Sequence, residues 1–250
     1  MNNDIKRVNK VSAVQNALEN LRKYIKDSNV KTLPSENEIS QSLGVSRLTL
    51  REAIIILEKE GVVSRIQGKG TLVNTFVTKL DNRVDTGNNI EDILKKYGYD
   101  IKFEVLSVEY KIASEYEQIE MGINDTDEVL VIEKVLYAND KSVAIYVDRI
   151  PKKYLKTFNF EKDYFNLAIL KIIDEIIELK ISHDVIKIKA VACDKRRAKL
   201  FSIKENTPLI SFDILEYNRD GLVVMYNTEY YTGEFVDFTI CRNVAYKAWS

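Results

Sequence analysis

Residues 33–73, LPSENEISQSLGVSRLTLREAIIILEKEGVVSRIQGKGTLV, decide how the N-terminal part of the chain folds. Ser35 followed by Glu38 has the spacing of a capping box, which predicts the start of a helix. Gly44 is placed to end that helix, because the position after a helix favours a positive φ. Ser46 is a second N-cap candidate, so a second helix is expected directly after a tight turn.

The second predicted helix has an inward and an outward face. Its inward stripe recurs at helical spacing and consists of Leu50, Ile54 and Leu57. Arg47 and Arg51 are four residues apart and lie off that stripe, on the exposed face. Gly61 ends the helix. Two short strands are then expected around the tip Gln67-Gly68-Lys69-Gly70.

Two helices joined by a short glycine-containing turn are typical of the helix-turn-helix motif. In that motif the second helix enters the major groove of DNA, and its first residues are nearest the base edges. Arginine is the commonest specific donor there, because it binds guanine in a bidentate manner. The glycine tip lets the backbone approach a phosphate, and Lys69 supplies charge. The alternative is an ordinary helical pair with a hairpin and no DNA contacts.

This stretch resembles the GntR family of bacterial transcription regulators. The matching residues are Leu33-Pro34-Ser35-Glu36, Leu43-Gly44-Val45-Ser46-Arg47, Thr49-Leu50-Arg51-Glu52-Ala53, Leu57-Glu58, Glu60-Gly61 and Gly68-Lys69-Gly70-Thr71. The resemblance implies a winged helix-turn-helix whose DNA-binding residues are Ser35, Asn37, Ser46, Arg47, Thr49, Arg51, Gly68, Lys69, Gly70 and Thr71. Two positions depart from the family pattern: it often has arginine where Asn37 stands and a small polar residue where Leu48 stands.

Composition limits the classes of protein that fit. The chain has 250 residues, of which 45% are hydrophobic and 30% charged, as in globular proteins of one or two domains. It has no apolar run of about 18 residues and no apolar leader segment, so we expect no membrane span and no signal peptide. Cys193 and Cys241 are the only cysteines, which favours a reducing cytoplasm over a disulfide framework.

Charge is unevenly distributed along the chain. Residues 1–79 carry 13 Lys/Arg and 8 Asp/Glu, a balance of +5, and residues 80–250 carry 24 and 30, a balance of −6, which together give the net charge of −1. The positive part contains the predicted helix-turn-helix, as expected of a module that binds phosphates.

Three regions follow from the patterning. We predict a DNA-binding domain over 1–74, a linker over 75–89 that lacks periodicity, and a second domain over 90–250. In the second domain, residues 128–138 and 142–150 predict one hairpin, 209–218 and 223–231 another, and 183–193 a further strand. Residues 165–179 predict a helix whose inward residues are Leu167, Leu170, Ile173 and Ile177. Residues 235–242 are expected to close the sheet.

The predicted fold class is therefore α+β, with an antiparallel sheet in the second domain. The order of elements over about residues 90–242 resembles the UTRA domain, the effector-binding module of the HutC branch of GntR regulators, which implies a chorismate-lyase-like fold. The matching segments are Leu130-Val131-Ile132-Glu133-Lys134, Ala138-Asn139-Asp140-Lys141, Ile150-Pro151, Pro208-Leu209 and Tyr230-Tyr231-Thr232-Gly233-Glu234-Phe235.

The residues expected to bind the effector depart from those of phosphosugar-sensing members. At the family's two arginine positions the chain has Lys134 and Leu136, and at its Ser-x-Tyr it has Asn166 and Ala168. The two glutamate positions hold Tyr146 and Met225, whereas Tyr231 matches. The expected effector-binding residues are Lys134, Tyr146, Asn166, Met225 and Tyr231. We expect Lys134 to meet a carboxylate or a single phosphate, and the ligand to be more apolar than a phosphosugar. The alternative is that these residues only pack the sheet.

The sequence predicts no catalytic residues, no metal ligands and no cofactor. His183 is the only histidine, and neither metal-ligand spacing nor a nucleophile elbow accompanies it. We therefore expect a cytoplasmic DNA-binding transcription regulator rather than an enzyme. It should act as a repressor, bind its operator as a homodimer and respond to a small-molecule effector. Two alternatives stay open: a non-regulatory DNA-binding protein with a dimerisation domain, and a chorismate-lyase-like enzyme carrying a DNA module.

Overall fold

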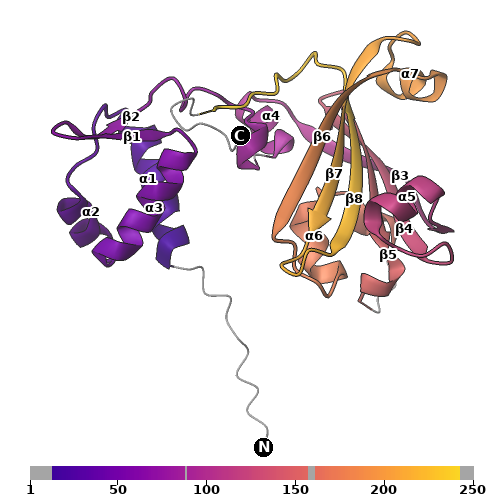
Figure 1. Ribbon diagram of the computed structural model, residues 1–250. Helices are drawn as coiled ribbons and strands as arrows, with labels where there is room; N and C mark the ends of the chain where they lie inside the picture. The colour runs from indigo at the N-terminus through magenta and orange to yellow at the C-terminus, as the bar shows by residue number, and fades with distance from the viewer. Residues whose placement is uncertain (1–12, 88, 157–160, 243–250) are drawn as a thin grey trace, which may run out of the picture. The chain divides into compact units, whose positions relative to one another are not determined.

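The structure, a computed structural model, describes residues 13–87, 89–156 and 161–242 and separates them into two compact units (Figure 1). The first unit contains the described residues up to Asn89 together with 238–242, and the second runs from Ile90 to Asp237. The predicted linker, 75–89, thus lies within the first unit. Val77 and Arg83 in this segment are buried, because they contact the rest of that unit.

The first unit is a three-helix bundle with a two-stranded wing (Figure 1). Its elements are α1 (Ala13–Ser28), α2 (Glu36–Leu43), α3 (Arg47–Lys59), β1 (Val63–Ile66), β2 (Gly70–Val73) and the short 3-10 helix η1 (Val84–Thr86). The apolar stripe of α3 is buried against α1 and α2, and the fully buried residues include Leu21, Leu50, Ile54 and Leu57.

The predicted helix ends are confirmed. The Ser35 hydroxyl accepts a hydrogen bond from the Glu38 backbone N–H, and the Glu38 carboxylate accepts one from the Ser35 backbone. Gly44 adopts φ 64°, a left-handed conformation that favours glycine. The short turn between α2 and α3 depends on that conformation, so local sequence alone determines where the second helix begins.

The second unit is built on one six-stranded antiparallel sheet in the order β3-β4-β5-β8-β7-β6. The strands are β3 (Ile101–Ile112), β4 (Glu128–Ala138), β5 (Lys141–Pro151), β6 (His183–Ala192), β7 (Pro208–Tyr217) and β8 (Val223–Tyr231). Both predicted hairpins are confirmed, as β4–β5 and β7–β8. The helical elements are α4 (Ile90–Lys96), α5 (Glu115–Met121), η2 (Lys152–Tyr154), η3 (Lys162–Phe165), α6 (Ile169–Ile176) and α7 (Lys195–Phe201).

Helices cover both faces of the sheet. The α6 isoleucines pack with Leu130, Ile132 and Met225, which share one face by strand alternation. Helix α5 packs through Met121 against Val129 and Val131 on the opposite face, and α7 packs through Phe201 on that same opposite face. The face under α6 is called the α6 face below.

The helix predicted over 165–179 is shorter and rotated relative to the prediction. Ile173 and Ile177 are buried as predicted, whereas Leu167 and Leu170, also predicted to face inward, are about half exposed, at 50% and 49%. The buried residues of α6 are Ile169, Ile172, Ile173 and Ile176. The reason is that η3 and an extended Ala168 come first, so the helix begins at Ile169 and its apolar stripe starts there.

The strand predicted over 235–242 does not close the sheet. Strand β8 ends at Tyr231, and residues 238–242 belong to the first unit, where Thr239 bridges to Arg83. Among the described residues, the sheet has six strands and ends at β3 and β6. The prediction failed because alternation identifies an extended segment but not the strand that it pairs with.

The two units contain matched capping boxes, one at Ser35 and Glu38 and one at Ser114 and Glu117. We expect Ser35→Ala and Ser114→Ala each to lower the free energy of unfolding by about 1 kcal/mol, because each leaves a helix N–H without its acceptor. Equilibrium denaturation in urea measures this. Ser42→Ala, an exposed serine within α2, is the control and should cause no loss. Equal stability of all three variants and the parent would contradict the capping account.

Candidate nucleic-acid interface and effector site

The start of α3 presents polar side chains to solvent. The Ser46 hydroxyl accepts a hydrogen bond from the Thr49 backbone N–H at 3.0 Å, and the two hydroxyl oxygens are 2.8 Å apart. Ser46, Arg47 and Leu48 are exposed, and Leu48 is 69% accessible. The first turn of α3 therefore offers hydroxyl, guanidinium and apolar groups side by side.

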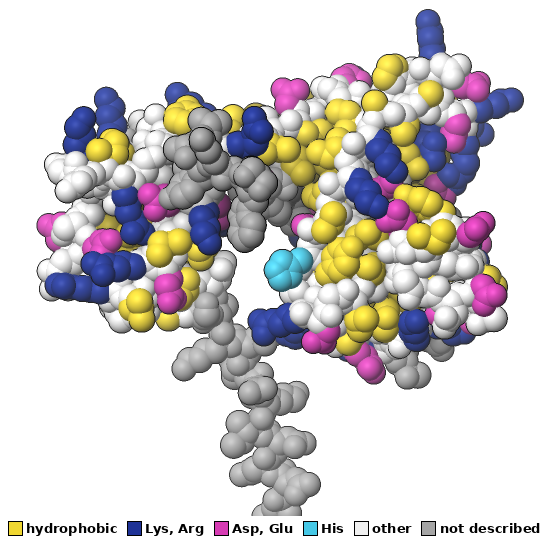
Figure 2. Space-filling view, in the orientation of Figure 1, with side chains coloured by type: hydrophobic (Ala, Val, Ile, Leu, Met, Phe, Trp, Pro, Cys, Tyr) yellow, Lys and Arg dark blue, Asp and Glu magenta, His cyan; other side chains and the backbone are white. Residues whose placement is uncertain are grey.

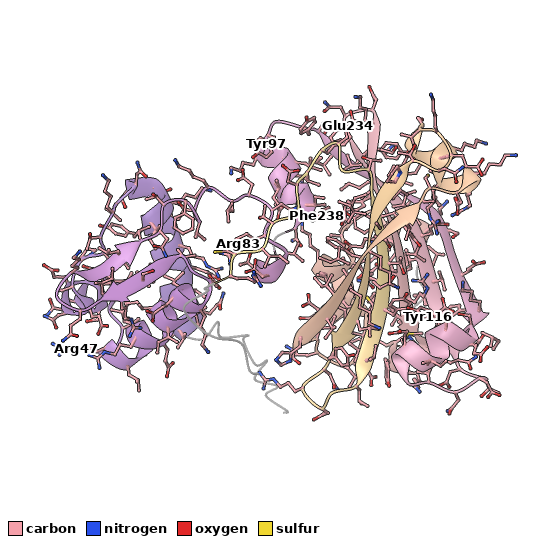
Figure 3. All side chains as sticks on the ribbon, turned by 45° about the horizontal axis from the view of Figure 1, so that its top comes forward. Arg47, Arg83, Tyr97, Tyr116, Glu234 and Phe238 are labelled. Atoms are coloured by element: carbon pink, nitrogen blue, oxygen red, sulfur yellow. The ribbon has the colours of Figure 1, made fainter. Side chains whose placement is uncertain are left out.

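Two side chains of α2 hold the arginines of α3. Arg47 Nη2 donates to Asn37 Oδ1 at 2.5 Å, and Arg51 Nε donates to Glu36 Oε2 at 2.6 Å. The hydrogen bond and charge of Glu36 raise the pKa of Arg51 above its ordinary value. Figure 3 shows Arg47 on the outer side of the first unit. Asn37 therefore orients Arg47, and both guanidinium groups stay exposed with further N–H donors available.

The wing tip has the backbone that its glycines predict. Gly68 and Gly70 have φ values of 79° and 82°, and no atom lies within 4 Å of the Cβ position of Gly68. Lys69 is exposed between them. The carbonyl of Thr71 accepts a hydrogen bond from the Leu33 N–H at 2.8 Å, which fixes the base of the wing.

These ten predicted DNA-binding residues come from α2, the start of α3 and the wing. Figure 2 shows Lys and Arg side chains spread over the first unit, with acidic side chains among them. The hydroxyls of Ser35 and Ser46 are already engaged in helix caps, the first with Glu38 and the second with Thr49.

Lys134 lies on the α6 face and is 1% exposed. Its Nζ is 3.0 Å from Asp148 Oδ2, a residue that is also 1% exposed, and it donates to the Leu167 carbonyl at 3.0 Å. The same Nζ lies 5.5 Å from the centre of the Phe103 ring. Lys134 was predicted to meet an anionic group of the effector. That role is not supported, because Asp148 already neutralises its charge.

Tyr146 and Tyr231 lie close together next to Lys134. Tyr146 is directly opposite Lys134 on the neighbouring strand, and its ring meets that of Tyr231 edge to face at 6.3 Å. The Tyr231 hydroxyl donates to Glu229 Oε2 at 2.5 Å. Burial raises the pKa of both phenols well above the ordinary value. Of the predicted effector residues, these two and Lys134 are brought together.

Of the other two predicted effector residues, Met225 lies on the same α6 face, opposite Glu216 on the neighbouring strand, whereas Asn166 lies outside this group. Met225 is fully buried in the apolar cluster beneath α6. Asn166 is exposed after η3, where its amide donates to Asp163 Oδ1 at 3.3 Å. The chain next to Asn166 still reaches the cluster, because Lys134 binds the carbonyl of Leu167.

Several acidic and amide side chains on or beside the α6 face were missed by the sequence prediction. They are Glu91, Asp148, Glu216, Asn227 and Glu229. With Lys134, Tyr146 and Tyr231 they form what is called the polar cluster below. Asn227 is opposite Asp148, and its Oδ1 is buried without a partner among the described residues. Polar residues two apart in otherwise apolar strands, as in Asn227-x-Glu229, were the available signal.

Burial shifts the acids of the polar cluster towards their neutral forms. The pKa of Glu229 is raised to about 7, chiefly by burial and also by the charge of Asp148, against the lowering effect of the Tyr231 hydrogen bond. The pKa of Glu216 is raised to about 8, chiefly by burial and also by the charges of Asp184 and Glu229. The polar cluster therefore contains four acidic side chains and one lysine. Two of its oxygen atoms, Asp148 Oδ2 and Asn227 Oδ1, accept no aligned hydrogen bond from the described residues.

An open hollow of about 550 Å³ lies elsewhere in the second unit, beside α7. Its lining includes Tyr137, Lys199, Phe201 and Phe235, and none of the predicted effector residues. Within the described residues, no group of three or more His, Cys, Asp or Glu side chains could hold a metal ion. A search of the same residues finds no helix long and apolar enough to cross a membrane.

The raised pKa values of Glu216 and Glu229 predict how stability depends on pH. Unfolded glutamate has a pKa of about 4.3, so the native state keeps protons that the unfolded state releases as pH rises from about 5 to 8. The contribution of these two groups to the free energy of unfolding should therefore fall by several kcal/mol across that range. Urea denaturation at several pH values measures it. Glu216→Gln should flatten the dependence, whereas Glu205→Gln, an exposed control, should leave it unchanged. A flat profile for the unmodified chain would contradict the assignment.

Comparison with known proteins agrees with this geometry. The family model for bacterial regulatory proteins of the gntR family matches residues 13–73, and the model for the UTRA domain matches residues 96–237. The HTH-type transcriptional repressor NagR of Bacillus subtilis (strain 168) is 24% identical over 226 residues, which cover 88% of this chain and 90% of NagR. The mannosyl-D-glycerate transport/metabolism system repressor MngR of Escherichia coli (strain K12) is 23% identical over 208 residues, 83% of this chain and 85% of MngR.

Solved structures show the same fold. The possible transcriptional regulator YydK from Bacillus subtilis superposes with a TM-score of 0.76 at 16% identity, over 93% of this chain and 100% of that one. Because the UTRA model alone spans more than half of the chain and the gntR model matches the helix-turn-helix, this protein belongs to the GntR family of bacterial transcription regulators and carries a UTRA domain.

Proposed function

We propose that this protein is a transcriptional repressor that binds operator DNA through its first unit and is regulated by a small molecule bound at the polar cluster. The observation that carries the DNA-binding part is the pair of exposed arginines that α2 side chains hold at the start of α3. Relatives named as repressors, NagR and MngR, support the sign of regulation.

The roles of the side chains follow from where they lie. Arg47 and Arg51 bind base edges or adjacent phosphates, and the hydroxyls of Ser46 and Thr49 bind phosphates. Leu48 departs from the family pattern, and as an exposed apolar side chain it is suited to the methyl group of thymine. The wing from Gly68 to Thr71 contacts the minor groove.

A homodimer is part of the proposal, because one helix-turn-helix reads only a half-site. The sheet edge at β6 supports it. This strand pairs with β7 alone, eight of its ten residues are exposed, and Val185 and Ile188 are 47% and 50% accessible on its two faces. A second copy that pairs along β6 would continue the sheet and cover these side chains.

The chemistry of the polar cluster narrows the effector class. Its acids exceed its bases and Lys134 is already paired, so the cluster is suited to a ligand that donates hydrogen bonds through hydroxyl or ammonium groups. Tyr146 and Tyr231 supply an apolar wall for the rest of the ligand. The proposal keeps the apolar contacts that the sequence predicted. It no longer includes a contact between Lys134 and a ligand carboxylate, and has the acids of the cluster accept hydrogen bonds from the ligand instead. The site still differs from one that binds a phosphosugar. MngR is named for mannosyl-D-glycerate, which bears hydroxyl groups and also a carboxylate, so its name supports the hydroxyl part of this proposal alone.

The two alternative functions make different predictions. A non-regulatory DNA-binding protein would bind random and selected duplexes with equal affinity. A chorismate-lyase-like enzyme would convert a ligand bound at the polar cluster into product. A regulator binds its ligand without turnover and prefers its operator.

Operator binding should depend on Arg51. A duplex selected by the full chain from a random library supplies the operator, and fluorescence anisotropy measures affinity. Arg51→Ala should weaken binding by about 1–3 kcal/mol, because a base contact is lost. Arg196→Ala is the matched control, since both side chains are 60% exposed and each is paired with one glutamate.

The control should bind the selected duplex as the parent does. Equal affinity of Arg51→Ala and the parent would remove Arg51 from the interface. Failure to select any duplex would contradict the proposed function as a whole.

A further inference from the structure

The open hollow beside α7 is chemically different from the polar cluster. It lies within the second unit on the face of the sheet opposite α6, because Tyr137 lines it and packs with α7 there. Its volume of about 550 Å³ is in the range of sites that bind small molecules. None of the residues to which the proposed function gives a role lines it.

One side of the hollow is apolar. The end of α7 and the residue after its cap contribute Leu200, Phe201 and Ile203, and the segment after β8 contributes Phe235. Phe201 is buried, and the Phe235 ring meets the Tyr99 ring edge to face, with their centres 5.9 Å apart. Side chains that are already ordered lose little conformational freedom when a flat apolar ligand binds against them.

The rim of the hollow is basic, although the second unit is acidic as a whole. Residues 195–204 carry five Lys/Arg and no Asp/Glu, whereas residues 80–250 have a balance of −6. Figure 2 shows Lys and Arg side chains projecting from the part of the second unit that contains α7. The charged residues of the lining are Lys141, Arg196, Lys199, Asp140 and Glu234.

Two of the three cations in the lining are already paired with acids. Lys141 Nζ is 3.3 Å from Glu234 Oε1, and Arg196 forms a bidentate ion pair with Glu133. Lys199 is exposed in the last turn of α7 and has no acidic partner in the described part of the chain. A ligand with one negative charge can therefore pair with Lys199 without displacing another acid.

Two serine hydroxyls of the lining form no hydrogen bond with a described residue. Ser142 is 9% exposed and lies opposite Tyr137, because a β-bulge at Val143 directs it to the α7 face. Ser202 ends α7 with a φ of 56°, a conformation that favours glycine. Serine at that position adds backbone strain and supplies a hydroxyl to the hollow. Strain of this kind is characteristic of binding sites rather than of packing.

We propose that the hollow beside α7 is a small-molecule site, separate from the polar cluster, that binds an aromatic carboxylate. The ring of the ligand lies against the apolar side of the hollow. Lys199 pairs with the carboxylate, and the hydroxyls of Ser142 and Ser202 donate hydrogen bonds to it. A phosphate, with its larger negative charge, fits less well because Asp140 and Glu234 repel it.

NMR titration of the full chain with small aromatic acids tests this site. Benzoate and phenylacetate should bind, whereas their uncharged counterparts benzamide and phenylacetamide should bind about tenfold more weakly, because the ion pair is lost. Phenyl phosphate should also bind more weakly than benzoate. Lys199→Met should raise the Kd of benzoate by about threefold or more. Lys195→Met, at an exposed lysine of α7 outside the lining, is the matched control and should leave the Kd unchanged.

Ser202→Gly and Asn206→Gly form a second matched pair that keeps the fold intact. Each replaces a residue with a positive φ, 56° and 66°, by the residue that this backbone favours. Ser202→Gly should weaken benzoate binding because it removes a hydroxyl from the lining, whereas Asn206 lies outside the lining and should have no effect.

The polar-cluster double variant Lys134→Met, Asp148→Leu should bind benzoate as the parent does, and loss of binding in it would overturn the separate site. Absence of carboxylate binding, equal binding of the amides, or tighter binding of phenyl phosphate would overturn the inference. An unchanged Kd in both Lys199→Met and Ser202→Gly would do so as well. Selection of an operator duplex tests the proposed function independently of this site.

Discussion

The ion pair between Lys134 and Asp148 is the interaction around which the second unit is arranged. Both side chains are 1% exposed, and the geometry leaves Asp148 Oδ2 without an aligned hydrogen bond. Such a pair recovers its desolvation cost only when further hydrogen bonds satisfy both groups, and an apolar pair of similar size is often as stable or more so. Stability alone therefore does not explain it. The proposed effector site would explain it, because a ligand could supply the missing donors and because Glu216 and Glu229 on the same face also have raised pKa values.

The two units use charge in opposite ways. In the first, Arg51 and Glu36 form an exposed pair, which contributes little to stability. Glu36 instead restricts where the Arg51 guanidinium lies on the surface of α3. Asn37 restricts the Arg47 guanidinium in the same way. In the second, the Lys134–Asp148 pair is buried on the α6 face and orients the neighbouring groups of the polar cluster. Exposed arginines suit the phosphates and base edges of DNA, whereas buried acids suit a small molecule.

Helix-capping residues in the sequence predicted the helices of the DNA-binding unit well. The second unit was predicted less well, because its neighbours are set by pairing between distant strands. Ser35, Gly44 and Ser46 each act on the nearest turn of the chain, so the sequence was sufficient to place α2 and α3. Asp148, Asn227 and Glu229 become neighbours only through the register of β5 with β8, which no single segment contains. The same limit explains residues 235–242, whose partner proved to be Arg83 rather than the sheet. The family resemblance pointed to Tyr146 and Tyr231, which lie beside Lys134 in the fold, but the partner of Lys134 had to come from the fold.

The central claim is that the polar cluster is the effector site, and a thermal-shift comparison of two proteins tests it most directly. The unmodified chain and the double variant Lys134→Met, Asp148→Leu are screened against polyols, amino sugars, phosphosugars, carboxylates and aromatic acids. The account predicts that a hydroxyl- or ammonium-bearing compound stabilises the unmodified chain, by about 2.7 kcal/mol at 100 times its Kd. The double variant should fold with similar stability, because an apolar pair replaces both charges, and should show no shift. Equal stabilisation of both proteins by that compound would contradict the account.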